Sequence, residues 1–258
     1  MSAVTEGDCP TPTRLPAEIW VLAGANIVIA LGYGVVAPVL PAYARNFGVS
    51  ISAATFVITA FAAMRLIFAP PSGLLVQKLG ERRVYLTGLL IVALSTLACA
   101  FAETYWQLLV FRSLGGAGSA MFTVSSLALM IRLSPFDARG RVAGLFSSAF
   151  MIGGVAGPVV GSLTAGLGLS VPFAIYGAAL VVAAAVVFVS LRNSTLAAPD
   201  EEAVGPTVSV RTVLRNRAYQ AALLSNLAAG WAALGLRVAL VPLFVVDVLH
   251  RSAGMAGL

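Results

Sequence analysis

The sequence predicts an all-helical integral membrane protein. Hydrophobic residues make up 59% of its 258 positions and charged residues only 10%, whereas soluble domains average about 45–50% and about 25%. The apolar residues also form long blocks, several of which reach the roughly 18 residues that a membrane-spanning helix needs. This composition argues against a soluble enzyme, a disordered chain and a secreted disulfide-rich domain.

Seven apolar segments support this fold class along the chain. They cover residues 19–43, 53–76, 84–102, 105–131, 142–166, 171–191 and 218–246. Short turns join the first six, whereas residues 192–217 are polar and contain Pro199 and Pro206, which is typical of a linker. We therefore expect a tail (1–18), a six-helix transmembrane bundle (19–191), a cytoplasmic linker (192–217) and the start of a second bundle (218–258).

The basic residues predict how the chain is oriented. Eleven of the sixteen lie on the side of the N-terminal tail and the linker, and only Arg45 and Arg251 lie on the other. Because Lys and Arg gather in cytoplasmic loops, the N-terminus and the linker are expected in the cytoplasm. The net charge of +6 is then explained by topology and not by binding to nucleic acid. The eleven residues are Arg14, Lys78, Arg82, Arg83, Arg132, Arg139, Arg141, Arg192, Arg211, Arg215 and Arg217.

The turn after the second span carries the first motif. It contains Gly73, Gln77, Lys78, Gly80, Glu81, Arg82 and Arg83. This pattern resembles the G-x-x-x-D-R-x-G-R-R signature of the major facilitator superfamily, with Gln77 and Glu81 as departures. Gly73 is expected to permit close helix packing, Gly80 to support a tight turn, and the cations to anchor the turn at the cytoplasmic face.

Three further spans carry motifs that resemble the same family. Span four contains Arg112 and a glycine-rich run, similar to R-x-x-Q-G-x-G-A with Gly115 in place of Gln. In similar proteins this arginine has been linked to proton transfer; the alternative is a structural arginine bonded to helix carbonyls. Span one ends with Pro38 and Pro41, and this proline pair also resembles the drug-exporter branch.

Span five resembles the G-x-x-x-G-P-x-x-G-G motif of drug–proton antiporters. Gly153, Gly157 and Gly161 are four residues apart, so they share one helix face and let another backbone approach closely. Pro158 removes one helix hydrogen bond and is expected to bend the span. The alternative is generic packing of small residues.

The resemblance implies a secondary transporter. Its expected activity is proton-coupled efflux of drugs or small metabolites by alternating access, in the inner membrane of a bacterium. Its expected partners are a small-molecule substrate and the lipid bilayer. The alternative is a non-transporting fragment or a half-size membrane protein that acts by association with another chain.

The end of the sequence favours an incomplete second half. A shift of 201 residues aligns Gly34 with Gly235 and Pro41 with Pro242, so the seventh span is expected to repeat the first. In that register the chain stops where an eighth helix should begin. We therefore expect most of the second bundle to be missing and the chain not to transport by itself.

The membrane interior is expected to be cationic. Arg65, Arg112 and Arg237 lie within spans, whereas every Asp and Glu lies near a membrane surface or in a turn. Such arginines should face a cavity or a partner, and they would suit an anionic substrate or be paired with acids elsewhere. Polar and aromatic cavity candidates are Asn26, Tyr33, Asn226 and Trp231, which could equally be interhelical contacts.

No sequence feature points to catalysis or to a bound cofactor. The sequence contains no phosphate-binding loop of the G-x-x-x-x-G-K-[ST] type, no metal-binding spacing and no Ser/His/Asp arrangement. Its two cysteines, Cys9 and Cys99, have no spacing typical of a metal site. We therefore expect no enzyme activity, no metal, no nucleotide and no cofactor.

Overall fold

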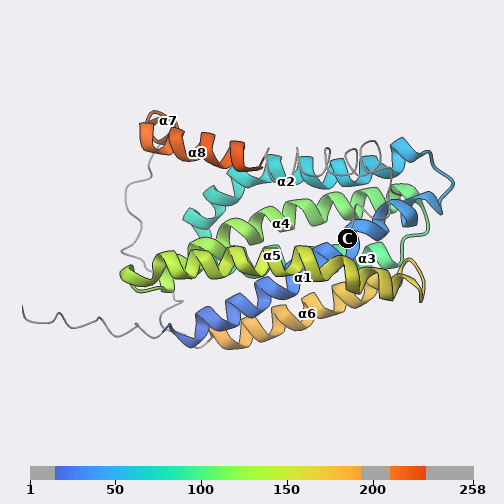
Figure 1. Ribbon diagram of the computed structural model, residues 1–258, viewed down its shortest axis with the longest axis horizontal. Coiled ribbons are helices and arrows are strands. Elements are labelled where there is room, and N and C mark those ends of the chain that lie inside the picture. Colours follow the sequence, from blue (N-terminus) through green and yellow to red (C-terminus); the bar gives the residue numbers. More distant parts are fainter. Residues whose placement is uncertain (1–14, 193–209, 231–258) are drawn as a thin grey trace, which may run out of the picture. The chain divides into compact units, whose positions relative to one another are not determined.

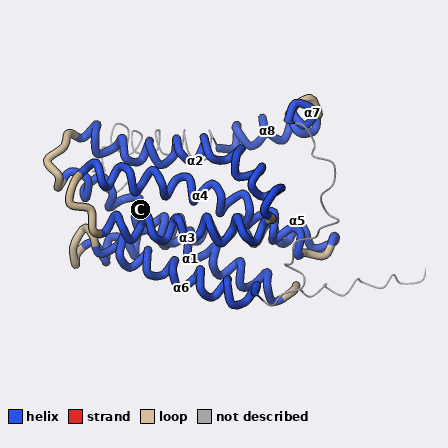
Figure 2. The backbone as a smooth tube through the Cα atoms, turned by 180° about the vertical axis from the view of Figure 1, so that it is seen from behind, coloured by secondary structure: helices blue, strands red, loops and turns tan. Residues whose placement is uncertain are grey.

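The computed structural model describes residues 15–192 and 210–230. These residues belong to two compact units, Met1–Asp200 and Glu201–Leu258. In both described ranges the regular structure is helical and no strand occurs (Figures 1 and 2). The all-helical fold class predicted from composition is therefore correct.

Six helices of the first unit are long and apolar enough to cross a membrane. Each begins and ends within a few residues of its expected span. A single 3₁₀ turn, Phe136–Ala138, precedes α5. The six helices are α1 (Ala17–Arg45), α2 (Ile51–Leu79), α3 (Glu81–Ala100), α4 (Tyr105–Leu133), α5 (Arg139–Ala165) and α6 (Val171–Arg192).

Local sequence explains several helix ends. Ser50 precedes α2 and its hydroxyl accepts a hydrogen bond from the Ala53 N–H at 3.2 Å. Thr104 caps α4 in the same way through the Gln107 N–H, at 3.3 Å. Gly80 separates α2 from α3 with φ +81°, a backbone conformation that favours glycine. These residues satisfy or redirect the backbone where an apolar run must end.

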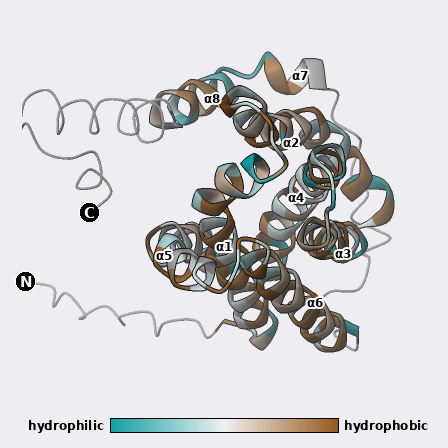
Figure 3. Cartoon of the chain, turned by 90° about the vertical axis from the view of Figure 1, so that its right-hand side faces the viewer, coloured by the Kyte–Doolittle hydropathy of each residue, from teal (hydrophilic) through white to brown (hydrophobic). Residues whose placement is uncertain are grey.

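The six helices pack in two groups. Helix α1 packs against α5 and α6, and α4 packs against α2 and α3. Figure 3, an end-on view, shows both groups, and α3 also packs against α6 and joins them. One hydrogen bond also links α1 to α3: the hydroxyl of Tyr43 donates to the Cys99 carbonyl at 2.9 Å.

The core of the bundle lies among α1, α3, α4 and α6. Tyr85 of α3 and Phe122 of α4 are fully buried, with ring centroids 5.1 Å apart. By contrast, only 17% of the most apolar stretch of α2 and 22% of that of α5 are buried, against 61% for α1 and 56% for α4. Helices α2 and α5 thus have one packed side and one broad exposed apolar side.

The second unit contains two described helices, α7 (Val210–Leu214) and α8 (Arg217–Gly230). The side-chain oxygen of Asn216 accepts a hydrogen bond from the Ala218 N–H at 2.9 Å and so caps α8. Helix α8 covers the first part of the expected seventh span, whose remainder lies outside the described residues. The expected linker contains α7, a short helix that the sequence analysis did not predict.

Candidate functional site

A charged and aromatic cluster lies where α1, α2 and α4 meet. Arg112 of α4 is only 4% exposed, and its guanidinium carbon lies 4.3 Å from the ring centroid of Phe61 on α2. The Phe61 ring lies 6.1 Å, centroid to centroid, from that of Tyr33 on α1. Tyr33 is 45% exposed, so the cluster extends from a buried cation to an accessible aromatic ring.

Glycines of α4 allow this arrangement. A side chain at Gly116 would collide with the backbone carbonyl of Phe61, and one at Gly115 would come within 2.9 Å of the Ser95 hydroxyl oxygen. The two glycines therefore let α2 and α3 approach α4 one turn from Arg112. The close approach of α2 brings the Phe61 ring over the guanidinium.

Arg65 lies on the same face of α2, one helical turn beyond Phe61. Its Nη2 donates a hydrogen bond to the Thr123 hydroxyl of α4 at 3.2 Å. The Thr123 hydroxyl donates in turn to the Ser119 carbonyl at 2.8 Å. Arg65 is half-buried, near the middle of a helix of 29 residues.

Carboxylates lie away from the middle of the spans. Within 15–192 and 210–230 the acids are Glu18, Glu81, Glu103 and Asp137, and each lies at a helix end or in a turn. The Nε of Arg112 is buried without a hydrogen-bond partner. Within the described bundle, Arg65 and Arg112 thus lie within spans whose carboxylates are at the helix ends. Arg237 lies outside the described residues.

The cavity candidates fall in different places. Asn26 is fully buried between α1 and α4, where it donates to the Met130 sulfur at 3.2 Å and accepts from the Ser126 hydroxyl at 3.0 Å. These contacts favour the interhelical interpretation of Asn26 over a place on a cavity wall. Asn226 lies on α8 in the second unit, and Trp231 lies outside the described residues.

The glycines of α5 face α1. Side chains at Gly153, Gly157 and Gly161 would collide with α1 at Ala30, Gly34 and Val35 respectively. Gly34 also faces the same seam, since a Cβ there would lie 3.3 Å from the Cδ of Pro158. The spacing of four residues thus places three glycines on one face, and that face carries the contact between α1 and α5.

The turn between α2 and α3 differs from expectation at one glycine. A side chain at Gly73 would meet no atom of the described structure within 4 Å, so the close packing expected there is not found. Gln77, Lys78 and Arg83 are exposed and Arg82 is half-buried. Exposed cations at this turn fit the expected anchoring at a membrane surface.

The same turn contains an ion pair that the sequence analysis missed. Glu81 at the start of α3 lies 3.4 Å from the Nε of Arg132 at the end of α4. Glu81 occupies a motif position where the family has an arginine. The sequence signal for the pair was this departure, because a carboxylate in place of a cation attracts a cationic neighbour.

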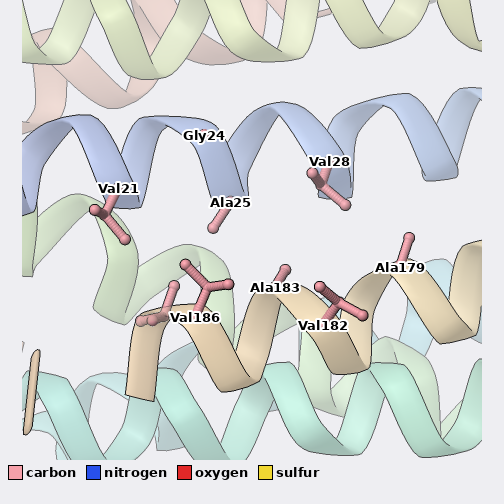
Figure 4. A pocket seen from close by; sticks show the side chains of 9 residues that line it. Val21, Gly24, Ala25, Val28, Ala179, Val182, Ala183 and Val186 are labelled. Carbon is pink, nitrogen blue, oxygen red and sulfur yellow. The ribbon is translucent and has the colours of Figure 1, made fainter. Parts of the chain in front are cut away.

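A groove between α1 and α6 is lined by apolar side chains (Figure 4). Its volume is about 470 Å³. Because its lining side chains offer no hydrogen-bonding group, the groove has no means to orient a polar ligand. The lining residues are Val21, Gly24, Ala25, Val28, Ala179, Val182, Ala183, Val186 and Val187.

The described residues contain no metal-binding cluster. No three or more His, Cys, Asp or Glu side chains of 15–192 and 210–230 gather where they could hold a metal ion.

Among the polar and apolar sites of the described bundle, the cluster of Tyr33, Phe61, Arg65 and Arg112 combines fixed charge with aromatic surface. Phe61 and Thr123 were missed from sequence because they sit in apolar runs, although Phe61 is four residues before Arg65.

Comparison with known proteins identifies relatives of this chain. "Multidrug resistance protein 2" of Bacillus subtilis is 31% identical over 180 residues, which cover 69% of this chain and 44% of that protein. "Quinolone resistance protein NorA" of Staphylococcus aureus is 30% identical over 161 residues, or 62% of this chain and 42% of that protein. The matched segment is thus less than half the length of these curated relatives.

The fold has a counterpart among solved structures. The crystal structure of the peptide transporter POT in complex with sulfate superposes with a TM-score of 0.66 at 18% identity, and the match covers 92% of this chain and 53% of that one. At this identity the likeness shows a shared fold. The profile of the Major Facilitator Superfamily matches residues 22–258, and the chain therefore belongs to that superfamily of membrane transporters.

Proposed function

We propose that the protein is a secondary transporter that exports drugs or small metabolites from a bacterial cell. The observation that carries the proposal is the seam between α1 and α5, where Gly153, Gly157 and Gly161 of an antiporter-like motif meet α1. The similarity of the chain to two drug-resistance proteins, over 180 and 161 residues, supports the same direction of transport.

The proposed mechanism is alternating access. In such carriers two bundles rock about a site near the middle of the membrane, and the six-helix bundle α1–α6 would supply one wall. Arg65 lies near the middle of α2, at the depth that such a site requires. The exposed sides of α2 and α5 provide apolar surface that a second bundle would cover.

We further propose that export is driven by protons. A proton-coupled carrier usually has a titratable group inside the membrane. The carboxylates of residues 15–192 and 210–230 lie at helix ends and turns. The coupling carboxylate is then expected outside these residues, or coupling runs through Arg112 without a buried acid.

A cellular efflux assay tests both parts of the proposal. Bacteria that lack their own drug exporters are loaded with a panel of anionic, neutral and cationic fluorescent amphiphiles, with and without the chain joined to a second six-helix bundle. The joined protein should lower the accumulation of at least one probe, and a protonophore should restore it. Unchanged accumulation of every probe contradicts export, and lowered accumulation that resists the protonophore contradicts proton coupling.

A second candidate function is association with another membrane chain. The broad exposed sides of α2 and α5 favour it, because spanning helices bind one another through such surfaces. Crosslinking in cells between a cysteine introduced at exposed Leu66 or Val155 and one defined partner, without any change in probe accumulation, would support this function over export.

A further inference from the structure

Arg112 is a buried charge without a counter-ion in the described bundle. It is 4% exposed, and its Nε has no hydrogen-bond partner. Charged groups inside a membrane normally pair with one another or with backbone carbonyls, because an isolated charge is strongly disfavoured in a medium of low polarity. Within 15–192 and 210–230 no ion pair or hydrogen bond to Arg112 is found. Its contact with Phe61 fixes the guanidinium in place and leaves the charge uncompensated.

Arg65 adds a second cation with spare donors. A guanidinium has five N–H donors, and the bond that Arg65 makes within the described bundle is the one to Thr123, at 3.2 Å. Because Arg65 is half-buried, its remaining donors are within reach of a ligand. Arg65 is four residues beyond Phe61 and bonds to Thr123 of α4, so it lies on the side of α2 that packs against α4.

Tyr33 supplies an accessible aromatic surface next to Phe61, the ring that contacts Arg112. It is 45% exposed, and its ring centroid is 6.1 Å from that of Phe61. Two like charges on neighbouring helices raise the local positive potential and attract anions. An aromatic ring beside them favours a ligand that also has a flat apolar part.

Building on the proposed transport function, we propose that Arg65 and Arg112 bind the anionic group of an amphipathic organic anion whose ring system lies on Tyr33. Arg65 contacts the carboxylate or sulfonate directly, because it is the accessible cation. Arg112 stays against Phe61 and contributes a fixed positive charge. The competing explanation is a carboxylate from outside the described residues that neutralises both arginines.

A pair of fluorescent probes separates these explanations. 1-Anilinonaphthalene-8-sulfonate and N-phenyl-1-naphthylamine share one ring system, and only the first has a sulfonate. Both are titrated into the purified 258-residue chain in a neutral detergent. The proposal predicts tighter binding of the sulfonate probe. If the arginines are already neutralised, the chain binds both probes alike, and this result overturns the proposal.

Variants of the two arginines test whether these residues cause the tighter binding of the sulfonate probe. Arg65→Gln should weaken sulfonate binding by about tenfold or more, the effect expected on losing a charged hydrogen-bond partner. Arg112→Gln removes a fixed charge that does not touch the ligand, so it should weaken sulfonate binding by a smaller factor. Both should leave the binding of the neutral probe unchanged. Arg65→Lys should retain most of the preference because it keeps the charge. Arg45→Gln, at an exposed arginine of α1, is the matched control and should change neither affinity.

The outcomes distinguish this site from the transport function. Equal weakening of both probes by Arg65→Gln, with helix content and elution volume unchanged, means a structural role and overturns the proposal. Loss of the anion preference in Arg45→Gln overturns it as well. A preference of the purified chain for the sulfonate, together with no efflux by the chain joined to a second bundle, contradicts the proposed function and supports the site. Efflux without any anion preference contradicts the site alone.

Discussion

Arg112 illustrates how one side chain can be tolerated inside a membrane. An arginine at the centre of a spanning helix costs about 2.5–3.5 kcal/mol on insertion scales. Its contact with the Phe61 ring, at 4.3 Å from the centroid, offsets part of this, since a desolvated cation–π contact contributes about 2 kcal/mol. The remaining imbalance is the physical reason to look for an anion at this site.

Replacement of Phe61 tests the cation–π contact. Phe61→Leu removes the ring from a position that is 6% exposed, so the purified chain should lose about 1–3 kcal/mol of stability, from cavity and cation–π terms together. Phe61→Tyr keeps the ring and serves as the control. Thermal unfolding in detergent measures both. Equal melting temperatures for the Leu and Tyr variants would show that the ring does not stabilise Arg112.

Asn26 gives a second prediction for a single residue. Its amide joins α1 to Met130 and Ser126 of α4, and interhelical hydrogen bonds in membranes average about 0.6 kcal/mol and reach about 1.7 kcal/mol. Asn26→Ala should therefore lower the melting temperature modestly. Because Asn26 is fully buried, the KM for any exported probe should not change. A changed KM with unchanged stability would place Asn26 on a cavity wall instead.

At the scale of the helix, α5 is held mainly by the close approach of its glycines to the backbone of α1. Contacts of large side chains contribute less. Gly153, Gly157 and Gly161 are buried, whereas most residues between them are exposed. Without a hydrophobic driving force between helices in lipid, such contacts depend on van der Waals packing over small residues. The exposed side of α5 is then free to meet another surface.

Gly157→Ala tests this seam with a neighbouring control. A Cβ at Gly157 would lie 2.8 Å from the Leu31 carbonyl oxygen and would also collide with Gly34, whereas one at Gly154 would meet nothing within 4 Å. Gly157→Ala should destabilise the chain by about 1–3 kcal/mol through overpacking, and Gly154→Ala should be nearly neutral. Thermal unfolding of the two variants compares them directly. If both melt at the same temperature, the seam does not need a glycine at 157.

The glycine pattern also shows what sequence can and cannot predict. A spacing of four residues predicts that Gly153, Gly157 and Gly161 share a face of their own helix. It does not reveal which helix meets that face, because the partner is set by the packing of the whole bundle. The Glu81–Arg132 pair was missed for the same reason: its members are far apart in sequence and meet only once α3 and α4 pack together.

Elements were easier to predict than contacts. The six spans of the bundle follow from long apolar runs that end at polar or glycine-containing turns, such as Ser50 and Gly80. Gly73 was expected to permit close packing and instead faces open space in the described structure. A glycine in a motif thus indicates that another helix can approach the backbone closely at that position. Only the fold shows whether another helix packs there.

For the whole molecule, the distribution of charge sets the orientation that we propose. Basic residues gather where α2 meets α3 and where α4 meets α5, whereas Arg45 is at the opposite end of the bundle. This asymmetry predicts a cytoplasmic N-terminus. The structure offers a matched pair of reporters for it: Phe101 follows α3 and is 77% exposed, and Phe136 follows α4 and is 85% exposed.

Cysteine labelling at these two positions tests the orientation. Phe101→Cys and Phe136→Cys are made in a Cys9→Ser background, where the remaining native Cys99 is buried. A membrane-impermeant maleimide added to intact spheroplasts should label Phe101→Cys and spare Phe136→Cys, because only the turn after α3 is expected outside. After lysis both should be labelled, which controls for reactivity. Labelling of Phe136→Cys alone in intact spheroplasts would reverse the proposed topology, and the basic turns would then face outward against the tendency of Lys and Arg to remain in the cytoplasm.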